Sequence, residues 1–323
     1  MKCKDLVSLA DLSKEDIRKI IALALWLKAE VKAGRSRPLL AGKTLGMIFN
    51  KPSLRTRVSF EVAMLQLGGN ALYLSPNEVQ LGRRESIPDV ARVLSRYVDA
   101  IMLRTFAHRE VELLAEYSTV PVVNGLSDLS HPCQALGDLL TVLEAKGRLE
   151  GTTLTYVGDG NNVANSLLLA CSKVGVNMVV ATPDGFSCDP AYVEKAKEAA
   201  AGNGCNVRLM EDPREAVAGA DVIYTDVWTS MGQEAERESR VKILEPYRVD
   251  ARLLSLAAPD AVVMHCLPAH RGEEITDDVI DGPQSIVFDQ AENRLHIQKA
   301  ILALLVNKSA SSLCATEGAP VSK

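Results

Sequence analysis

The sequence predicts an α/β protein with two doubly wound domains, each built on a parallel sheet with helices on both faces. Short apolar runs alternate with helical stretches from residue 44 to residue 305, and this alternation is typical of parallel βαβ units. The chain of 323 residues is too long for one ordinary domain and suits two domains of roughly 150 residues each. A hydrophobic share of 47% and a charged share of 24% are typical of a well-packed globular protein.

The first half of the chain contains four expected pairs of a strand and a helix. Each strand is a short apolar run, and each helix is the longer stretch that follows it. The strands are expected at 44–49, 70–74, 100–104 and 120–124, and the helices at 54–67, 88–97, 109–117 and 132–146.

The pattern then restarts, which indicates a second domain. Its strands are expected at 153–157, 178–181, 222–225, 262–265 and 286–288, and the helices at 163–174, 191–201 and 291–305. We place the first domain at residues 1–147, completed by the C-terminal helix 291–306, and the second at 148–290. Residues 307–323 are rich in Ser, Ala, Gly and Pro and are expected to form a disordered tail.

Composition excludes several classes of function. The net charge of -5 leaves no basic excess to neutralise a nucleic-acid backbone. No apolar run reaches the length of a membrane span, and the first residues lack the apolar core of a secretory signal, so we expect a soluble protein. The seven cysteines are scattered and never form a Cys-x-x-Cys pair, which argues against a disulfide framework and a structural zinc site and favours a reducing cytoplasm.

Unusual polar residues follow the expected strands at their carboxyl ends, where ligands bind in open α/β sheets. Five separate segments carry these candidates. They are Ser53, Leu54, Arg55, Thr56 and Arg57 after the first strand, Arg104 at the end of the third, His131 and Gln134 after the fourth, and Asp226 and Cys266 in the second half. Their number predicts an active site in the cleft between the two domains.

The segment from Ser53 to Arg57 opens a helix and suits a phosphate. Ser53 is a good N-cap candidate, and free backbone N–H groups and the positive end of the helix dipole gather next to it. Arg55 and Arg57 can hold phosphate oxygens. A capped, solvated helix start would have the same composition, so this segment alone leaves both interpretations open.

His131, Cys266 and Asp226 each have a structural alternative. His131 could cap a helix, lie in the core or donate to a carbonyl oxygen. Cys266 could be a plain buried thiol, and because His265 points the opposite way in a strand, we expect a substrate contact and not covalent catalysis. Asp226 precedes the loop Trp228–Gly232 and could cap a surface loop or hold an amino group.

The turn Gly158-Asp-Gly160 follows a strand, as in dinucleotide-binding folds. The fingerprint requires a third glycine where this chain has Val163, so we expect a tight turn that presents backbone amides and no nucleotide cofactor. Asn162 could bind a small polar substrate, whereas Asn161 is more typical of an N-cap.

Together these segments resemble the aspartate/ornithine carbamoyltransferase family over residues 6–305. The family motifs Ser-x-Arg-Thr-Arg and His-Pro-x-Gln stand at 53–57 and 131–134. The ornithine branch has His-Cys-Leu-Pro, found at 265–268, where the aspartate branch has His-Pro-Leu-Pro, and it has Asp-x-x-x-Ser-Met-Gly, found at 226–232. The segment 288–296 is equally typical, whereas Leu54 stands where Thr or Met is commoner.

The resemblance implies transfer of the carbamoyl group from carbamoyl phosphate, bound by the first domain, to the side-chain amine of ornithine, bound by the second. It implies no metal, no organic cofactor, and a homotrimer or a multiple of trimers. The implied carbamoyl phosphate contacts are Ser53, Leu54, Arg55, Thr56, Arg57, Gln80, Arg104, His131, Gln134, Cys266, Leu267 and Arg294, with Gln80 lent to a neighbouring subunit. The implied ornithine contacts are Asn162, Asp226, Ser230 and Met231. The implied catalytic residues are Arg104, His131, Asp226 and Cys266.

Two other functions stay open at this stage. Another carbamoyltransferase would act on putrescine or N-acetylornithine, which the Ser-Met-Gly loop argues against. A non-catalytic binding protein on the same scaffold would be expected to lose its phosphate arginines, but Arg55, Arg57, Arg104 and Arg294 are all present. The same site residues would serve arginine biosynthesis and arginine breakdown.

Overall fold

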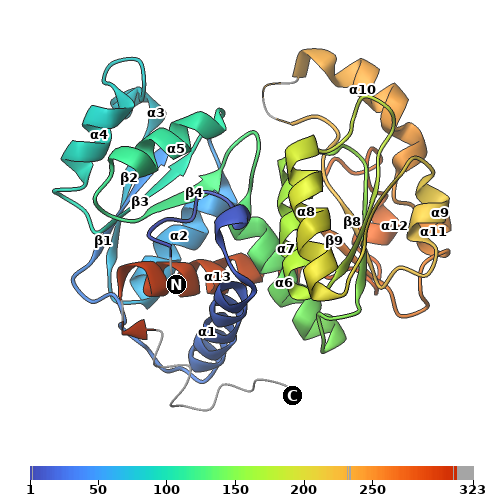
Figure 1. Ribbon diagram of the computed structural model, residues 1–323, viewed down its shortest axis with the longest axis horizontal. Helices are drawn as coiled ribbons and strands as arrows, with labels where there is room; N and C mark the ends of the chain where they lie inside the picture. Colours follow the sequence, from blue (N-terminus) through green and yellow to red (C-terminus); the bar gives the residue numbers. More distant parts are fainter. Residues whose placement is uncertain (2, 231, 233, 308, 311–323) are drawn as a thin grey trace. The chain divides into compact units, whose positions relative to one another are not determined.

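The computed structural model describes residues 1, 3–230, 232, 234–307, 309 and 310. These residues form two compact units (Figure 1). Unit 1 contains Met1–Leu140 and the described part of Glu292–Lys323, and unit 2 contains Thr141–Ala291. The unit limits lie inside two helices, α6 (Pro132–Lys146) and α13 (Val287–Val306). Residues 308 and 311–323 of the expected tail lie outside the described residues, and the domain limits expected from the sequence stay predictions.

Unit 1 is built on a four-stranded parallel sheet, so the α/β class predicted from the sequence is confirmed here. Its strands are β1 (Thr44–Phe49), β2 (Asn70–Leu74), β3 (Ala100–Arg104) and β4 (Val122–Leu126), in the order β2-β1-β3-β4. The chain runs from β1 to β2 on one side and later to β3 on the other, so the topological switch point lies between β1 and β3. The register pairs Phe49 with Arg104 at the carboxyl end of these two strands.

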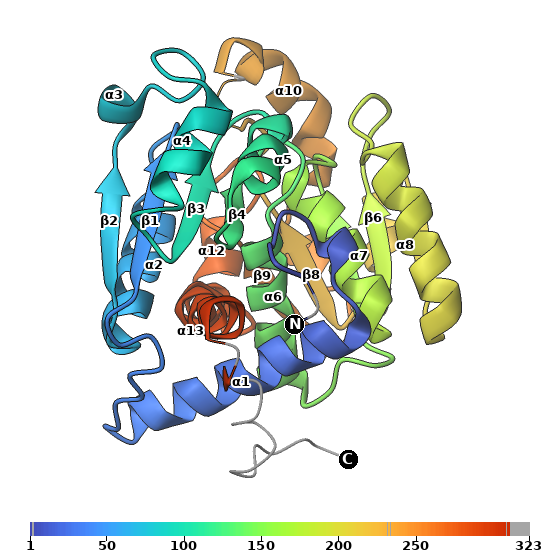
Figure 2. The same cartoon turned by 60° about the vertical axis from the view of Figure 1, so that its left-hand side comes forward.

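Helices cover both faces of this sheet (Figure 2). Helix α2 (Leu54–Gln66) packs on β1 and β2, while α4 (Ile87–Leu94) and α5 (His108–Tyr117) pack together over the other face, as right-handed crossovers require.

Helix α1 (Lys14–Lys32) was not expected from the strand pattern. It starts at a capping box between Ser13 and Asp16, and its Lys28 Nζ donates to Asn293 Oδ1 of α13 at 2.8 Å. The elements are η1 (Leu9–Asp11), α1 (Lys14–Lys32), α2 (Leu54–Gln66), α3 (Pro76–Val79), α4 (Ile87–Leu94), α5 (His108–Tyr117), the first part of α6, and α13.

Unit 2 has a five-stranded parallel sheet of the same class. Its strands are β5 (Thr153–Val157), β6 (Asn177–Ala181), β7 (Val207–Met210), β8 (Val222–Thr225) and β9 (Val262–His265), in the order β7-β6-β5-β8-β9. The switch point therefore lies between β5 and β8. Strand β7 was not expected, because it is a short edge strand whose two central residues are exposed and which lacks the continuous apolar run of its neighbours.

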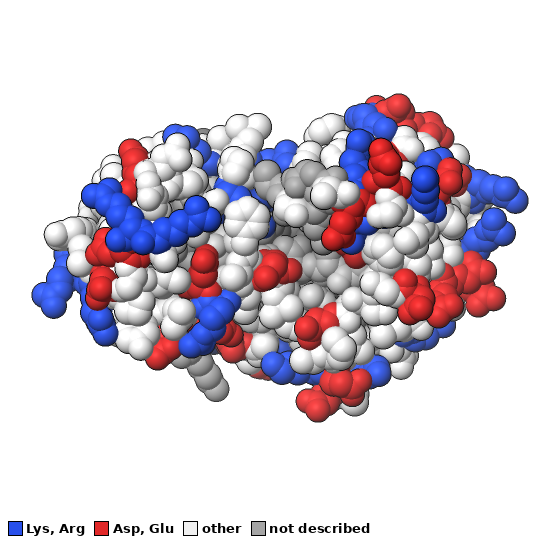
Figure 3. Space-filling model, turned by 90° about the horizontal axis from the view of Figure 1, so that it is seen from above, with Lys and Arg blue, Asp and Glu red and all other residues white. Residues whose placement is uncertain are grey.

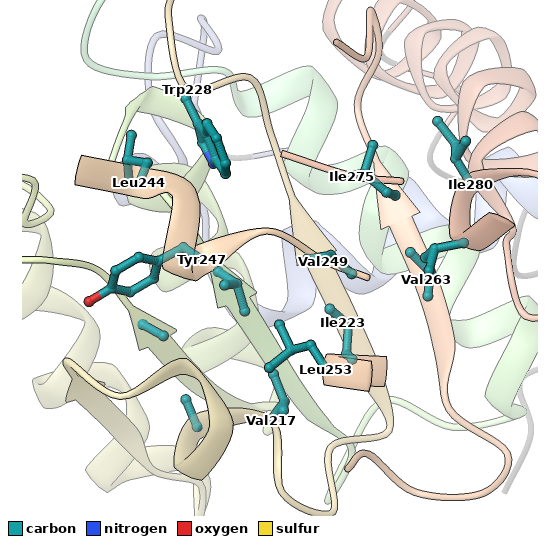
Figure 4. Packing of buried hydrophobic residues seen from close by; sticks show 14 of the residues in the cluster. Val217, Ile223, Trp228, Leu244, Tyr247, Val249, Leu253, Val263, Ile275 and Ile280 are labelled. Atoms are coloured by element: carbon teal, nitrogen blue, oxygen red, sulfur yellow. The ribbon is translucent and has the colours of Figure 1, made fainter. Parts of the chain in front are cut away.

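The helices of unit 2 also lie on both faces of its sheet. Helices α7 (Asn162–Val174) and α8 (Pro190–Asn203) pack against each other on one face. On the other face, α9 (Pro213–Val217), α10 (Arg237–Leu244), η3 (Glu245–Tyr247), α11 (Ala251–Leu254) and α12 (Asp277–Ile280) contribute residues to one buried cluster with the strands, and η2 (Glu234–Glu236) precedes α10. The core beneath them is apolar, and Trp228, Leu244, Tyr247, Val249 and Val263 belong to one buried cluster (Figure 4).

One expected strand is wrong. Residues 286–288 do not join the sheet, because Ser285 forms only an isolated bridge with Val263 and α13 begins at Val287. The Gln290 N–H donates to the Ile286 carbonyl at 2.9 Å, which continues the helix into this segment. An apolar run of three residues, two of them β-branched, is compatible with either structure, and the tertiary context selects the helix.

The helices and the surface charges can be compared with two expectations from the sequence, the lack of a membrane span and the lack of a broad basic surface. Among the described residues, no helix is both long and apolar enough to cross a membrane. On the face seen in Figure 3, Lys and Arg side chains lie among Asp and Glu side chains on both units. This distribution agrees with the net charge of -5, which predicts no broad basic surface.

Candidate functional site

The first candidate site lies at the carboxyl end of β1, beside the switch point of unit 1. Ser53 caps α2 as predicted, since its Oγ accepts a hydrogen bond from the Thr56 backbone N–H at 3.3 Å. The remaining N–H groups of this first helical turn, together with the helix dipole, favour an anion at this position.

A chain of buried polar side chains lies next to this helix start. Thr56 Oγ1 accepts hydrogen bonds from Arg104 Nη1 at 3.4 Å and from Arg294 Nη2 at 3.3 Å. Arg294 Nη1 also donates to Gln134 Oε1 at 2.5 Å, and Gln134 Nε2 donates to Asp138 Oδ1 at 2.8 Å. The structure thus brings together four predicted site residues from four separate segments of the sequence.

His131 is buried beside these cations. Its burial, followed by the positive charges of Arg294, Arg104 and Lys51, lowers the pKa of His131 well below its usual range. The imidazole is therefore neutral at physiological pH and carries one N–H donor.

Lys51 is a further candidate site residue, which was not predicted from the sequence. It lies two residues after the end of β1 and is 7% exposed. Its burial and the charge of Arg104 lower the pKa of Lys51 to about 8. We call Lys51, Arg104 and Arg294 the cation cluster of unit 1. The available signal was a lysine at a strand end directly before the Pro52-Ser53 cap.

Arg57 and Arg55 are the neighbours of the buried Thr56 in α2, but neither is itself buried. The Arg57 guanidinium lies 3.9 Å from the ring centroid of Tyr73, and its Nε donates to Glu61 Oε1 at 3.0 Å. Arg55 is only partly buried. The structure therefore places Arg57 in contacts of its own, and neither arginine joins the hydrogen-bonded chain around Thr56.

Gln80 and Leu54 do not join the cation cluster either. Gln80 is an exposed residue that ends α3 in a left-handed conformation, with φ of 45°, and its Nε2 donates to the Asn77 carbonyl at 3.3 Å. Leu54 is 74% exposed, so the first residue of α2 does not cover the free amides of the helix start.

The second candidate site lies at the carboxyl ends of β5, β8 and β9 in unit 2. Asp226 is 5% exposed, and three groups donate to its carboxylate: Cys266 Sγ at 2.9 Å, the Val227 backbone N–H at 2.8 Å and Asn161 Nδ2 at 2.7 Å. Asn161 is also the N-cap of α7, as expected. The N-cap residue Asn161 is therefore hydrogen-bonded to Asp226, which is the candidate substrate residue.

Asp159 and Arg240 form a buried ion pair near Asp226 that was not predicted from the sequence. Arg240 Nη2 donates to Asp159 Oδ2 at 2.5 Å, and its Nε donates to the Trp228 carbonyl at 2.6 Å. Burial raises the pKa of Asp159 to about 6; the charge of Asp226 also raises it, and Arg240 opposes both. We call Asp159 and Asp226 the carboxylate cluster of unit 2.

The glycine turn after β5 differs from expectation in one respect. Its amides do not face a ligand, because the Gly158 N–H donates to the Ala181 carbonyl at 3.0 Å and the Gly160 N–H donates to the Phe186 carbonyl at 2.8 Å. A Cβ at Gly160 would lie 2.4 Å from the Cys188 nitrogen. Glycine is therefore required here for the close approach of two backbone segments.

The other residues expected at the ornithine site are only partly described. Asn162 is the first residue of α7 and is half-buried, and Ser230 is also half-buried. Met231 lies outside the described residues. Gly232 has φ of 99°, a conformation that favours glycine.

His265 is directed toward Glu274 and not toward a role as base. Its Nδ1 accepts from the Leu267 N–H at 2.9 Å, so the ring proton is on Nε2, which donates to Glu274 Oε1 at 3.0 Å. Asp226, His265 and Cys266 are close enough in space to be a candidate metal site. However, both ring nitrogens of His265 are engaged, so this histidine suits neither a metal ion nor activation of Cys266.

The two sites therefore suit ligand groups of opposite charge. The cation cluster and the free amides of α2 match a phosphate and a polarised carbonyl oxygen. The carboxylate cluster, with the Cys266 thiol next to it, matches an amine.

The comparisons with known proteins agree with this chemistry. Residues 4–144 match the carbamoyl-P binding domain, and residues 150–305 match the Asp/Orn binding domain, of aspartate/ornithine carbamoyltransferases. The chain is 57% identical over 303 residues to the ornithine carbamoyltransferase of Thermococcus kodakarensis, with 94% of this chain and 96% of that relative covered. It is 58% identical over 303 residues to "Ornithine carbamoyltransferase, anabolic" of Pyrococcus furiosus, again with 94% and 96% covered.

A solved structure supports the same relationship. The ornithine carbamoyltransferase from Pyrococcus furiosus matches the fold with a TM-score of 0.92 at 59% identity, covering 94% of this chain and 96% of that one. The fold of the present chain, its strand-end motifs and the matches along both of its units agree. The chain therefore belongs to the aspartate/ornithine carbamoyltransferase family.

Proposed function

We propose that this protein transfers the carbamoyl group of carbamoyl phosphate to the δ-amine of L-ornithine, giving L-citrulline and phosphate. The observation that carries the proposal is the hydrogen-bonded chain from Arg104 through Thr56 to Arg294, which lies beside a neutral His131 in the unit matched as carbamoyl-P binding. The relatives named ornithine carbamoyltransferase, from 55 to 58% identical, support ornithine as the acceptor.

The first demand of the chemistry is to stabilise charge on the carbonyl oxygen as the amine attacks. Arg104, the neutral imidazole of His131 and the Thr56 hydroxyl are the donors available for this oxygen. Because Thr56 already accepts from Arg104 and Arg294, its own proton is directed away from both arginines. The hydroxyl is therefore free to donate to a ligand.

The second demand is to stabilise the phosphate as it leaves. The backbone amides of residues 53–55 and the side chain of Arg55 are suited to this task, and the Thr56 amide would first have to release Ser53 Oγ. Arg57 would have to leave Glu61 to reach the phosphate. Lys51, with its lowered pKa, would add a charge close to Arg104.

The third demand is a neutral attacking amine, although a free amine of this kind has a pKa near 10.4. In our proposal Asp226 holds the α-amino group of ornithine, and Cys266 and Leu267 border the δ-amine. Asn162, Ser230 and Met231 complete the ornithine site, and the Ser230–Gly232 loop closes over it to exclude water. No metal or organic cofactor takes part in the proposed transfer.

The proposed setting is cytoplasmic arginine biosynthesis. The Pyrococcus furiosus relative is named anabolic, which supports the biosynthetic direction. The scattered cysteines, among which the described ones form no disulfide, suit a reducing compartment.

A citrulline assay with a choice of acceptors tests the function. Purified protein and carbamoyl phosphate are offered ornithine, N-acetylornithine, putrescine and aspartate in turn, and citrulline and phosphate are measured together. We expect equal amounts of both products with ornithine and a kcat/KM far above that for the other amines. A higher kcat/KM for putrescine or N-acetylornithine would assign a different carbamoyltransferase.

We further propose a homotrimer, or a multiple of trimers, in which Gln80 completes the phosphate site of a neighbouring subunit. Gln80 is exposed on its own subunit and ends a short helix that follows β2 at the edge of the sheet. The alternative is a solvated surface turn, which its charged neighbours would also suit.

Mixed subunits distinguish these alternatives. One inactive variant carries Arg104→Gln and another carries Gln80→Ala with Arg83→Ala. After joint unfolding and refolding at equal amounts, roughly a quarter of the sites in a closed ring should draw both intact halves, so activity should return. Mixed rings that are verified by mass and stay inactive would show that each subunit has a complete site of its own.

A further inference from the structure

A second polar cluster lies in unit 2, in the turn that follows the Cys266–Pro268 segment. Its members are His270, Glu273 and Glu274, and one possible ligand atom from each lies within 4.8 Å of the others. None of them belongs to the cation cluster or to the carboxylate cluster. We propose that these three side chains bind a divalent transition-metal ion of the Zn²⁺ and Co²⁺ class.

The spacing of the side chains fits one shared ion. His270 Nδ1 lies 3.7 Å from Glu273 Oε2, which is longer than a hydrogen bond. Two ligand atoms bound to one zinc ion at tetrahedral angles lie roughly 3.4 Å apart. A small inward movement of these two side chains would therefore complete the coordination.

Buried polar atoms in this cluster lack the partners that burial normally requires. Among the described residues, His270 Nδ1, Glu273 Oε2 and Glu274 Oε2 have no hydrogen-bond partner, and Glu274 is fully buried. A buried carboxylate oxygen without a partner costs free energy, so each such atom calls for an explanation. Two carboxylate oxygens and one imidazole nitrogen without a hydrogen-bond partner in one turn point to a ligand that they share.

The backbone of the turn holds the three side chains together before any ion binds. The Glu273 N–H donates to the His270 carbonyl at 2.9 Å, and the Gly272 N–H donates to the Ile275 carbonyl at 2.8 Å. The His270 N–H donates to Glu274 Oε1 at 2.6 Å. Gly272, with φ of 87°, permits this tight turn. Such preorganisation lowers the entropic cost of binding an ion.

The surrounding charges leave room for a dication. Arg237 pairs with Glu273 Oε1, and Arg248 Nε donates to the Glu273 carbonyl at 2.9 Å. Arg271 is turned to Asp277 and Asp281. The two carboxylates are thus only partly neutralised. Because one ligand is an imidazole, zinc and cobalt are favoured over the calcium and magnesium ions that prefer oxygen ligands alone.

The proposed ion would bind next to the strand end that carries Cys266. Glu274 Oε1 accepts from His265, whose Nδ1 accepts from the Leu267 N–H, so Glu274 connects the ion to this segment. We expect the ion to raise the midpoint of thermal unfolding, because it binds only the folded turn. It is not part of the carbamoyl transfer, so the metal-free protein should keep its activity.

Cobalt titration of the full-length protein, freed of metal by a chelator, tests the proposal. We expect one Co²⁺ per chain with visible absorption bands of low symmetry, displaced by Zn²⁺. His270→Ala and Glu273→Gln should each weaken Co²⁺ binding by at least about tenfold. Asp277→Asn is the matched control, since it removes an equal charge from the same segment without touching the cluster. Equal midpoints of the metal-free variants and the metal-free wild type would verify folding.

Two results would overturn this assignment. One is Co²⁺ affinity that is equal in the wild type and in both cluster variants, including no binding by any of them. The other is sulfur-to-cobalt charge-transfer absorption that Cys266→Ala abolishes together with binding, because the ion would then be held at Asp226 and Cys266 and not in this turn.

Discussion

Unit 1 and unit 2 both gather polar side chains at the switch point of a parallel sheet, but the charges that they gather are opposite. Between β1 and β3 stand Arg104 and Lys51, with Arg294 brought in by α13. Between β5 and β8 stand Asp159 and Asp226. The common topology thus sets the position of a ligand, whereas the side chains set its chemistry.

The two units also hold their charges differently. In unit 1 the two arginines share a neutral acceptor, the Thr56 hydroxyl, and Arg294 also donates to the neutral amide oxygen of Gln134. In unit 2 Asp159 is neutralised by Arg240, whereas the hydrogen-bond donors to Asp226 are uncharged. Asp226 is therefore the carboxylate with charge left for an ammonium ligand.

The largest expected effect concerns the cation cluster. Replacing Arg104 by Gln removes a donor aimed at the developing oxyanion, so we expect kcat/KM for carbamoyl phosphate to fall by about 10²–10³-fold. The free energy of unfolding should not fall in parallel, because the change also removes repulsion from Lys51. Steady-state kinetics and urea unfolding measure the two effects.

Arg109→Gln is the matched control for this prediction. Arg109 is an exposed arginine of unit 1 that pairs with Glu112 at 3.0 Å. Its kinetics should equal those of the wild type. If Arg104→Gln stayed within a few fold of the wild type, the charges of unit 1 would not act on the reacting group.

The fold was predictable where one local pattern decides the structure. Both sheets were expected because their central strands are short runs of mainly apolar residues, and the start of α2 was expected because Ser53 has the side chain of a cap. The run at 286–288 misled the prediction, because three apolar residues do not distinguish a strand from the first turn of a helix.

The candidate site was predictable where a motif stands at a strand end, as at Thr56 and Asp226. The sequence could not show how these residues are joined. Arg240 is 81 residues from Asp159 and lies in a helix with no apolar stripe or motif to mark it. Lys51 becomes part of the candidate site only in the folded protein, where the pairing of β1 and β3 brings Arg104 close to it.

The next largest expected effect is a pH dependence of the free energy of unfolding. It arises in unit 2 and so sharpens the contrast between the two units. The pKa of Asp159 is raised from 3.8 to about 6 by burial and by Asp226. The folded state therefore holds a proton that the unfolded state has lost between these values. The contribution of Asp159 to the free energy of unfolding should fall by roughly 3 kcal/mol in all as the pH rises from about 2 to about 8, with most of the fall between about pH 4 and about pH 6.

Urea unfolding of the wild type and of Asp159→Asn at several pH values measures this effect. The difference in free energy, wild type minus variant, should decrease over this range and level off above pH 7. Any constant cost of leaving Arg240 without its carboxylate does not affect that slope. Asp184→Asn, an exposed carboxylate after β6, is the control. A difference that is flat or rises with pH would contradict the buried, disfavoured carboxylate.

The smallest expected effect tests whether the two units bind their ligands independently. Norvaline keeps the α-amino and carboxylate groups of ornithine but lacks the attacking amine, so it should inhibit competitively with ornithine. Asp226→Asn keeps the size of the side chain and removes the charge, so norvaline should bind at least about tenfold more weakly. Carbamoyl phosphate, bound by the cation cluster, should keep its affinity in the same variant. Calorimetry of each ligand measures both numbers in one protein, which makes carbamoyl phosphate the internal control. If norvaline bound the two proteins equally, Asp226 would not hold the α-amino group. If both ligands weakened together, the charge of unit 2 would act on the site of unit 1, and the division of the chemistry between the two units would be wrong.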